Sequence, residues 1–308
     1  MEKAKLPIYD VEEDIARALL NDKNRSRLII EAPTGSGKST QLPQILINKK
    51  LISSGEIVIL QPRRVAARVL AKRVANEIGC RLGDVVGYQV RFEKEISKNT
   101  KIRFVTEGIL LRQFLVDPNL SEVGAIVFDE FHERHVQSDV ILAMALELQK
   151  KSRNDLKLIV MSATLSASRI AKYLSPCSTV KCSGRTFPVT VKHLNANLKV
   201  KAIWDVIADV IKKEILKNCI SGDVLIFVHG AYEIRKTIEK LRTLKQLKNA
   251  LLIPLYGDLN QRQQEIALEP SDKRKIIVST NIAETSLTID GVEVVVDSGL
   301  ARIASYDR

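Results

Sequence analysis

The segment Glu31–Thr40, EAPTGSGKST, lies between two apolar runs, the second of which is Leu42–Leu46. It nearly matches the pattern G-x-x-x-x-G-K-[ST], with an alanine in place of the first glycine. Gly35 and Gly37 allow the backbone to turn its N–H groups toward an anion, and the amino terminus of the helix expected after the loop adds its positive dipole end. The segment therefore predicts a strand, a phosphate-binding loop and a helix, the opening unit of a parallel α/β fold.

The polar side chains of this loop predict a bound nucleoside triphosphate with Mg²⁺. Lys38 would reach the β and γ phosphates, and Ser39, in the first helical turn, would offer its hydroxyl to the metal. The loop residues expected around the nucleotide are Thr34, Gly35, Ser36, Gly37, Lys38, Ser39 and Thr40.

A second segment, Val127–His135, reads VFDEFHERH and raises the question of a zinc site. His132 and Glu133 begin an H-E-x-x-H pattern, in which two histidines four positions apart hold zinc on one helix face. The spacing fails, because the second histidine is His135 and the position after it is Val136. No Cys or further His nearby completes a tetrahedral set, so the segment argues against zinc.

The two acids of the same segment are better explained as partners of the phosphate loop. The unbroken apolar run Ala125–Phe128 suits the middle of a parallel sheet that is covered on both faces, and ligands bind where the strands of such sheets end. Asp129 would hold Mg²⁺ together with Ser39, and Glu130 would orient and activate the attacking water.

Apolar runs alternate with helical patterns along most of the 308 residues, which is typical of wound α/β sheets. The strands expected in a first unit are Leu28–Ala32, Ile57–Gln61, Ile102–Thr106, Ala125–Phe128 and Leu158–Ser162. Those expected in a second unit are Asp223–Val228, Leu251–Leu255, Lys275–Ser279 and Val292–Asp297. Gly184 and Pro188 interrupt the chain between the two series, which predicts domains at residues 1–184 and 185–308.

The composition predicts a basic globular protein. The 48 Lys+Arg against 36 Asp+Glu give a formal net charge of +12, which favours a polyanion such as nucleic acid but equally fits a solvated basic surface. Neither the amino-terminal stretch MEKAKLPIYD nor any later stretch is apolar enough for a signal peptide or a membrane span, so we expect a cytoplasmic protein with no membrane partner.

Three further segments follow expected strands and carry groups suited to phosphates. Arg63 and Arg64, in QPRRVAA, would bind the phosphates of a strand crossing the carboxyl edge of the sheet, and Thr106 would add a hydroxyl. Ser162 and Thr164, in VMSAT, would sense the γ-phosphate and transmit its loss. Taken singly, such residues are more often structural, because Ser and Thr commonly cap the next helix.

Taken in order, APTGSGKST, QPRRVAA, TEG, DEFH and SAT resemble the first-domain motifs of superfamily 2 helicases of the DEAH/RHA family. The second half continues the resemblance with VLIFVHGAYEI at Val224–Ile234, PLYG at Pro254–Gly257 and TNIAETSLTI at Thr280–Ile289. Phe131 in place of alanine, and the segments GRTFPV and VVDSG, are similar to the bacterial HrpB-like branch. The resemblance covers nearly the whole chain.

The resemblance implies two tandem RecA-like P-loop domains with parallel sheets. It also implies ATP-driven movement along single-stranded RNA, or sometimes DNA, typically from 3′ to 5′. The residues that it places on the nucleic-acid backbone are Arg63, Arg64, Thr106 and Thr280.

The resemblance assigns the nucleotide further contacts. Ser286 and Asp290 would approach it from the second domain, and His132 would complete the catalytic set formed by Lys38, Asp129 and Glu130. Arg73 falls where the family has an arginine that stacks on the base. A solvated helix residue is an equally good interpretation of Arg73.

The resemblance also implies that the second domain is incomplete, because the family's Q-x-x-G-R-x-G-R motif is expected beyond Arg308, together with further C-terminal domains. Loss of the arginine that this motif supplies can cost about 10³–10⁵ in rate. Two interpretations stay open: the motor portion of a helicase, and a truncated, nucleotide-dependent RNA-binding module with little turnover. The segments QPRR, TEG and TNIAETSLTI argue against a third, a signalling NTPase that needs no nucleic acid. The oligomeric state is not predicted.

Overall fold

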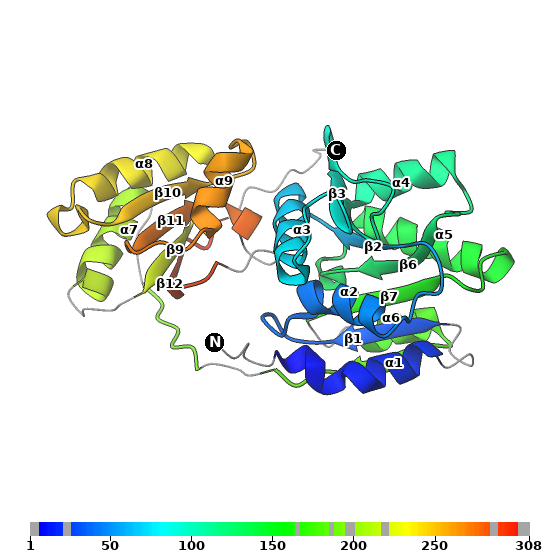
Figure 1. Cartoon of the computed structure of the whole chain (residues 1–308). Coiled ribbons are helices and arrows are strands. Elements are labelled where there is room, and N and C mark those ends of the chain that lie inside the picture. Colours follow the sequence, from blue (N-terminus) through cyan, green and yellow to red (C-terminus); the bar gives the residue numbers. More distant parts are fainter. Residues whose placement is uncertain are drawn as a thin grey trace, which may run out of the picture. The chain divides into compact units, whose positions relative to one another are not determined.

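The chain forms two compact units, Met1–Phe187 and Pro188–Arg308, in a computed structural model. The structure describes residues 6–20, 26–163, 167–184, 188–194, 201–216, 222–283 and 289–300. Each unit has its own sheet and its own hydrophobic cores, and each is described by itself (Figure 1).

The first unit is built on an eight-stranded sheet with the strand order β4-β3-β5-β2-β6-β7-β1-β8. Its strands are β1 (Arg27–Glu31), β2 (Glu56–Gln61), β3 (Val86–Val90), β4 (Glu93–Glu95), β5 (Ile102–Thr106), β6 (Val123–Phe128), β7 (Lys157–Ser162) and β8 (Ser178–Lys181). Neighbouring strands are parallel, apart from the antiparallel pair β3 and β4. The carboxyl ends of the parallel strands therefore share one edge of the sheet.

Helices cover both faces of this sheet (Figure 1). One face packs against α1 (Glu12–Leu20), α2 (Lys38–Asn48) and α3 (Arg64–Ile78). The other packs against α4 (Glu107–Val116), α5 (Val136–Lys151) and α6 (Ala167–Leu174). Two short 3₁₀ helices, η1 (Pro7–Val11) and η3 (Phe131–Glu133), bring chain segments to the edge where the loops lie.

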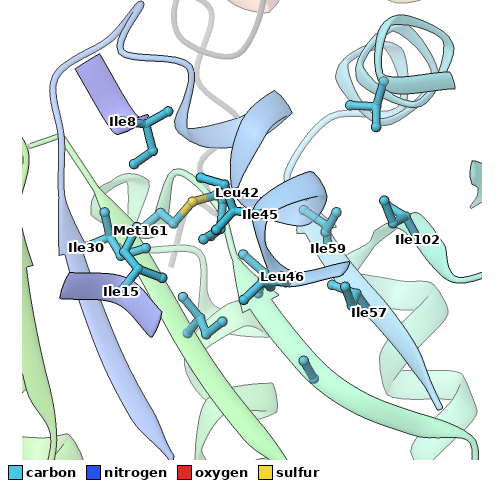
Figure 2. Close-up of a cluster of buried hydrophobic side chains, with 14 of the residues drawn as sticks. Ile8, Ile15, Ile30, Leu42, Ile45, Leu46, Ile57, Ile59, Ile102 and Met161 are labelled. Atoms are coloured by element: carbon cyan, nitrogen blue, oxygen red, sulfur yellow. The ribbon is translucent and has the colours of Figure 1, made fainter. Parts of the chain in front are cut away.

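The apolar runs of the strands are explained by this double covering. Successive side chains of a strand point to opposite faces, so a central strand needs apolar residues at every position. In β2, Ile57 and Ile59 enter the core beneath α2, shown in Figure 2, whereas Val58 and Leu60 enter the core beneath α4 and α5. All six residues of β6 are buried, which confirms the expectation for the run before Asp129. Each fully buried aliphatic side chain stabilises the fold by about 1.5–3 kcal/mol.

The sheet differs from the expected one at its edges. The sequence pattern predicts the central strands, but not the β3–β4 hairpin or the last strand, β8. The reason is chemical, since β4 consists of three exposed charged residues and β8 has only two residues that are not exposed. The hairpin strand β4 runs antiparallel to β3, at one edge of an otherwise parallel sheet.

The second unit has a four-stranded parallel sheet with the order β10-β11-β9-β12. Its strands are β9 (Asp223–Phe227), β10 (Leu251–Leu255), β11 (Lys275–Ser279) and β12 (Val292–Asp297), in agreement with the predicted runs. The helices are α7 (Ile203–Val210), which continues as a π-helical turn, α8 (Ala231–Arg242) and α9 (Gln261–Leu268). The expected fold class, two tandem α/β units with parallel sheets, is confirmed. Within the described ranges, no helix is both long enough and apolar enough to cross a membrane.

Candidate nucleotide and nucleic-acid site

The phosphate loop joins β1 to α2 in the first unit. Gly35 and Gly37 have φ angles of 76° and 88°, in the left-handed region that glycine adopts without strain. Helix α2 begins directly after Gly37, at Lys38, so the amino end of the helix faces the loop. Loop and helix together form the anion-binding arrangement that the sequence predicts.

Two backbone hydrogen bonds hold the loop in place. The N–H of Ala32 donates to the carbonyl of Ser162, at the end of β7, over 3.1 Å. The N–H of Ile8, in η1, donates to the carbonyl of Ser36 over 3.1 Å. The loop is therefore fixed both to the sheet and to the segment that precedes α1.

Lys38 and Glu130 form an ion pair beside this loop. Lys38 Nζ lies 3.2 Å from Glu130 Oε1, and each side chain is only 4% exposed. Glu130 Oε2 and Ser36 Oγ are also buried, and neither has a hydrogen-bond partner among the described residues. An unsatisfied buried polar atom costs about 1–3 kcal/mol. The site thus contains a buried cation and polar oxygens that a ligand would satisfy.

Asp129 lies at the end of β6 and is held by two donors. Its Oδ2 accepts a hydrogen bond of 2.5 Å from Gln61 Nε2, and its Oδ1 accepts one of 2.9 Å from the backbone N–H of Glu130. Oxygen donors such as this carboxylate and the Ser39 hydroxyl are the ligands that Mg²⁺ prefers, so the donor set fits the predicted metal. Gln61 is a partner that sequence reasoning missed, although its position at the end of a neighbouring strand was a usable signal.

Glu130 has an unusual backbone and an unusual acidity. Its φ of 48° places it in the left-handed region, which is rare for a residue with a side chain. Burial, and next the negative charge of Asp129, raise the pKa of Glu130 to about 7, although Lys38 acts in the opposite direction. A carboxylate with a pKa near neutrality is suited to proton transfer.

His132 lies within η3, close to Glu130. Its Nδ1 is 3.4 Å from Glu130 Oε2, but it has no hydrogen-bond partner within the described part of the chain. Burial, and next the charge of Lys38, lower the pKa of His132. The imidazole is therefore neutral at physiological pH and beside the carboxylate predicted to act as base.

The predicted nucleic-acid residues of the first unit lie at the same sheet edge. Since β5, β2 and β6 are neighbours, Thr106, Arg63 and Asp129 follow adjacent strands. Arg63 immediately precedes α3 and Arg64 is its first residue, with an exposed side chain. Thr106 immediately precedes α4 and is half-buried. The structure thus brings the predicted strand contacts next to the acids.

A cluster of charged and polar side chains connects these segments, and sequence reasoning gave no role to its members other than Arg63. Arg63 Nη2 lies 3.4 Å from Glu133 Oε2. His135 lies between two carboxylates, with Nε2 3.3 Å from Glu133 Oε2 and Nδ1 3.0 Å from Glu107 Oε1. Ser138 Oγ donates to the same Glu107 oxygen over 2.7 Å. The only signal in the sequence was the density of ionisable residues in VFDEFHERH.

Arg73 lies in α3 and is partly exposed. Its Nε donates to Glu77 Oε1 over 3.1 Å, and Glu77 Oε2 accepts hydrogen bonds from Gln41 and Gln44 of α2. Gln41 in turn accepts a hydrogen bond of 2.5 Å from the Tyr9 hydroxyl. Arg73 is therefore connected to the helix that follows the phosphate loop, and both interpretations of its role stay open.

The second unit has a cavity of about 510 Å³ at the carboxyl ends of its strands. Residues after all four strands line it, among them Thr280, His229, Tyr256 and Gly299. Asp290 is exposed and precedes β12, so it lies at the opposite edge of the sheet from Thr280. The predicted nucleic-acid and nucleotide residues of this unit are thus on different edges.

Two predicted residues, Thr164 and Ser286, lie outside the described residues. Ser162, the partner of Thr164 in the prediction, is fully buried at the end of β7. In the ranges that the structure covers, no group of three or more His, Cys, Asp and Glu side chains is arranged to hold a metal ion.

The first unit has the fold and the loop of the α/β proteins that bind phosphate at the end of a parallel strand, with acids on a neighbouring strand. Residues 10–173 match the family model described as DEAD/DEAH box helicase, and residues 206–306 match the model described as helicase conserved C-terminal domain. The chain therefore belongs to the DEAD/DEAH box helicase family.

Individual relatives agree with this assignment. The chain is 40% identical to the ATP-dependent RNA helicase HrpA of Borreliella burgdorferi, over 99% of this chain and 37% of that protein. It is also 40% identical to the ATP-dependent RNA helicase HrpB of Escherichia coli, over 98% of this chain and 37% of that protein. The crystal structure of the E. coli DEAH/RHA helicase HrpB matches with a TM-score of 0.88 and 40% identity, over 98% of this chain and 38% of that one.

The predicted resemblance to DEAH/RHA helicases, including HrpB, is thus confirmed. The chain spans little more than a third of the length of these relatives.

Proposed function

We propose that this chain is the motor portion of an ATP-dependent helicase that acts on single-stranded RNA, or on DNA, in the cytoplasm. The observation that carries the proposal is the buried Lys38–Glu130 ion pair between the phosphate loop and the acids of β6. The names of the relatives, ATP-dependent RNA helicases, support the same activity.

The proposed hydrolysis uses side chains that already lie together. Lys38 exchanges Glu130 for the β and γ phosphates, which the loop from Thr34 to Thr40 surrounds with N–H groups. Ser39 and Asp129 hold Mg²⁺, which neutralises charge on the phosphate oxygens when it is bound. Glu130, released from Lys38, accepts a proton from the attacking water as the water oxygen bonds to the γ-phosphorus and the nucleoside diphosphate leaves with the bridging oxygen. Neutral His132 orients the carboxylate from the side of Oε2.

The nucleic acid is proposed to contact both units through its backbone. Arg63 and Arg64 bind phosphates at the edge of the first sheet, with Thr106 donating a hydroxyl hydrogen bond. Thr280 makes the corresponding contact in the second unit, where the cavity at the strand ends supports a binding role.

Further residues are proposed to couple the two ligands. Ser286 and Asp290 approach the nucleotide from the second unit, and Ser162 and Thr164 respond to loss of the γ-phosphate. Arg73 contacts the base. Successive cycles then move the motor along the strand, from 3′ to 5′.

The test is ATP hydrolysis by the 308-residue chain, with and without single-stranded RNA, beside a Glu130→Gln control. RNA-stimulated turnover that disappears in the control supports the motor. Nucleotide-dependent RNA binding without turnover would instead identify an RNA-binding module. Absence of RNA binding under all nucleotide conditions would refute the proposal.

A further inference from the structure

The segment Glu130–Arg134 is a short, internally bonded piece of chain between two left-handed residues. The φ angles of Glu130 and Arg134 are 48° and 54°, and η3 lies between them. The N–H of Glu133 donates to the Glu130 carbonyl over 2.9 Å, and the N–H of Arg134 donates to the Phe131 carbonyl over 3.2 Å. These bonds close the turn and connect its two ends through the backbone.

Phe131 anchors the middle of this segment. Its ring is buried and packs edge-on against Phe128 of β6, with 5.8 Å between the ring centroids. The middle is thus fixed to the sheet, and the two ends are held by separate ion pairs.

The two ion pairs belong to two different ligand sites. At the first end, Glu130 is paired with Lys38 of the phosphate loop at 3.2 Å. At the other end, Glu133 is paired with Arg63, the first arginine of QPRR, at 3.4 Å. Each cation is one that the proposed function assigns to a phosphate, of the nucleotide in one case and of the nucleic acid in the other. Each phosphate therefore competes with a carboxylate of the same short segment.

His135 also contacts Glu133, and Glu107 holds His135 in turn. The His135 ring contacts the same Glu133 oxygen as Arg63 does, at 3.3 Å, and its other nitrogen is 3.0 Å from Glu107 Oε1. Glu107 directly follows Thr106, and its side chain is mostly buried. Glu133 is therefore held in place beside Arg63 by groups from the carboxyl end of β5 and from the start of α5.

We propose that Glu133 is a positioning residue that couples nucleic-acid binding to nucleotide binding. Without ligands, it holds Arg63 and thereby weakens the grip on a nucleic-acid phosphate. When a nucleotide phosphate takes Lys38, the Glu130 end of the segment is released, Glu133 loosens and Arg63 becomes available. By linkage, the strand promotes nucleotide binding by the same factor. This inference rests on the proposed function, because it needs both ligands to bind.

The size of the effect follows from the exposure of the pair. Both side chains of the Arg63–Glu133 pair retain some exposure, 20% and 13%. Ion pairs near the surface contribute about 0.2–1 kcal/mol, which corresponds to at most about fivefold in affinity. We therefore expect a coupling that modulates affinity and does not switch binding on or off.

The experiment compares single-stranded RNA affinity of the full chain with that of Glu133→Gln, by fluorescence anisotropy of a labelled oligouridine. Without nucleotide, Glu133→Gln should bind RNA more tightly, by up to about fivefold. With saturating Mg²⁺ and a non-hydrolysable ATP analogue, the two proteins should bind with the same affinity, because Arg63 is then available in both.

Glu93→Gln is the matched control. It removes one negative charge from the hairpin, where Glu93 pairs with Arg68 at 3.0 Å, and it does not touch the Glu130–Arg134 segment. Any gain in RNA affinity that comes only from the changed net charge should appear equally in both variants, with and without the analogue.

Arg63→Gln provides a second measurement should Glu133→Gln fold poorly, as judged by its thermal unfolding. It should bind RNA more weakly, and the analogue should no longer improve its RNA affinity as much as in the unsubstituted chain. Glu133→Gln affinities equal to those of the unsubstituted chain in both states, or an Arg63→Gln variant with undiminished coupling, would overturn the inference. If the unsubstituted chain binds no RNA at all, it is the proposed function that fails.

Discussion

At the scale of single residues, the site is a set of charges with more than one available partner. Lys38 is paired with Glu130 in this structure and with a phosphate in the proposed complex. The side chains of Lys38 and Glu130 are almost fully buried. A buried charge that loses its partner is costly, so each substitution here also affects the partner left behind.

Lys38→Ala should weaken binding of Mg²⁺-ADP by about 10–100-fold, because hydrogen bonds to charged groups contribute about 1.5–3 kcal/mol each. Isothermal titration calorimetry measures this directly. Lys49→Ala, which removes a cation paired with Glu12 and Glu13 at the end of α2, is the control and should bind normally. Unchanged affinity of the Lys38 variant would mean that the phosphate-loop assignment is wrong.

The raised pKa of Glu130 gives the stability of the protein a specific pH dependence. The folded chain holds this proton more tightly than the unfolded chain, where the carboxyl titrates near its ordinary value of 4.5. The resulting stabilisation is present at low pH and is lost as the pH rises through about 7.

Glu130→Gln imitates the protonated form and removes this dependence. The melting temperature of this variant minus that of the unsubstituted chain should therefore increase between pH 5 and pH 7.5, on top of a constant cost for leaving Lys38 without its carboxylate. A difference in melting temperature that stays constant over this pH range would mean that Glu130 is ionised throughout.

The sequence predicted the residues that carry recognisable motifs but not their partners. Lys38, Asp129 and Glu130 follow from spacing after strands. Gln61, which donates to Asp129, and the cluster of Glu133, His135 and Glu107 depend on which strands are neighbours and on the turn of η3. Strand order is a property of the whole sheet, so no local pattern gives these contacts.

At the scale of elements, the phosphate loop depends on the chain that packs against it. A Cβ built on Gly37 would lie 2.8 Å from Leu6 Cδ1 and 3.2 Å from Leu6 Cβ. A Cβ built on Gly35 meets nothing within 4 Å. Both glycines have a left-handed backbone, but only Gly37 has neighbouring side-chain atoms that an added Cβ would meet.

This difference predicts unequal effects of two similar substitutions. Gly35→Ala should destabilise the nucleotide-free chain by about 1 kcal/mol, the cost of placing a side chain in the left-handed region. Gly37→Ala should cost more, because Leu6 and Gln41, which also lies 3.2 Å from the added Cβ through its Cγ, must move. Chemical denaturation measures both, and Leu6→Ala in the Gly37→Ala background should recover part of the excess, since it removes the Cδ1 contact. Equal destabilisation by both substitutions would show that Leu6 imposes no constraint.

The elements themselves were predictable where they are long, apolar and central. The run Ile102–Thr106 became β5 with the same limits, and the four runs of the second unit became β9 to β12. The β3–β4 hairpin was not predictable, because a strand of three charged residues has no hydrophobic pattern. Its position instead comes from contacts such as that of Arg68 with Glu93.

At the scale of the whole molecule, the formal charge of +12 and the strand ends of two units suit the proposed binding of a polyanion at several points. Binding of this kind releases counterions from the phosphates of the nucleic acid. The release becomes less favourable as salt is added, so the affinity falls. The slope of log K against log salt therefore measures the number of cationic contacts with phosphates.

Two substitutions, one in each unit, should therefore differ in their effects: one should change both the affinity and its salt dependence, and the other only the affinity. Arg63→Ala should weaken single-stranded RNA binding and reduce the slope of log K against log salt by about 0.7, the share of one phosphate contact. Thr280→Ala should weaken binding without changing the slope, because a hydroxyl carries no charge. Fluorescence anisotropy titrations at salt concentrations between about 50 and 300 mM distinguish the two variants. A reduced slope for the Thr280 variant would contradict its assignment as a neutral contact.

The contact of η1 with the phosphate loop has a practical consequence for anyone who shortens this protein. The family match begins at residue 10, yet Ile8 is fully buried, its N–H holds the Ser36 carbonyl, and Leu6 lies against Gly37. A version that starts where the family match starts would keep every motif, but it would lose Leu6 and Ile8, which contact the phosphate loop. The smallest piece that keeps the phosphate loop supported therefore starts before the smallest piece that the family match recognises.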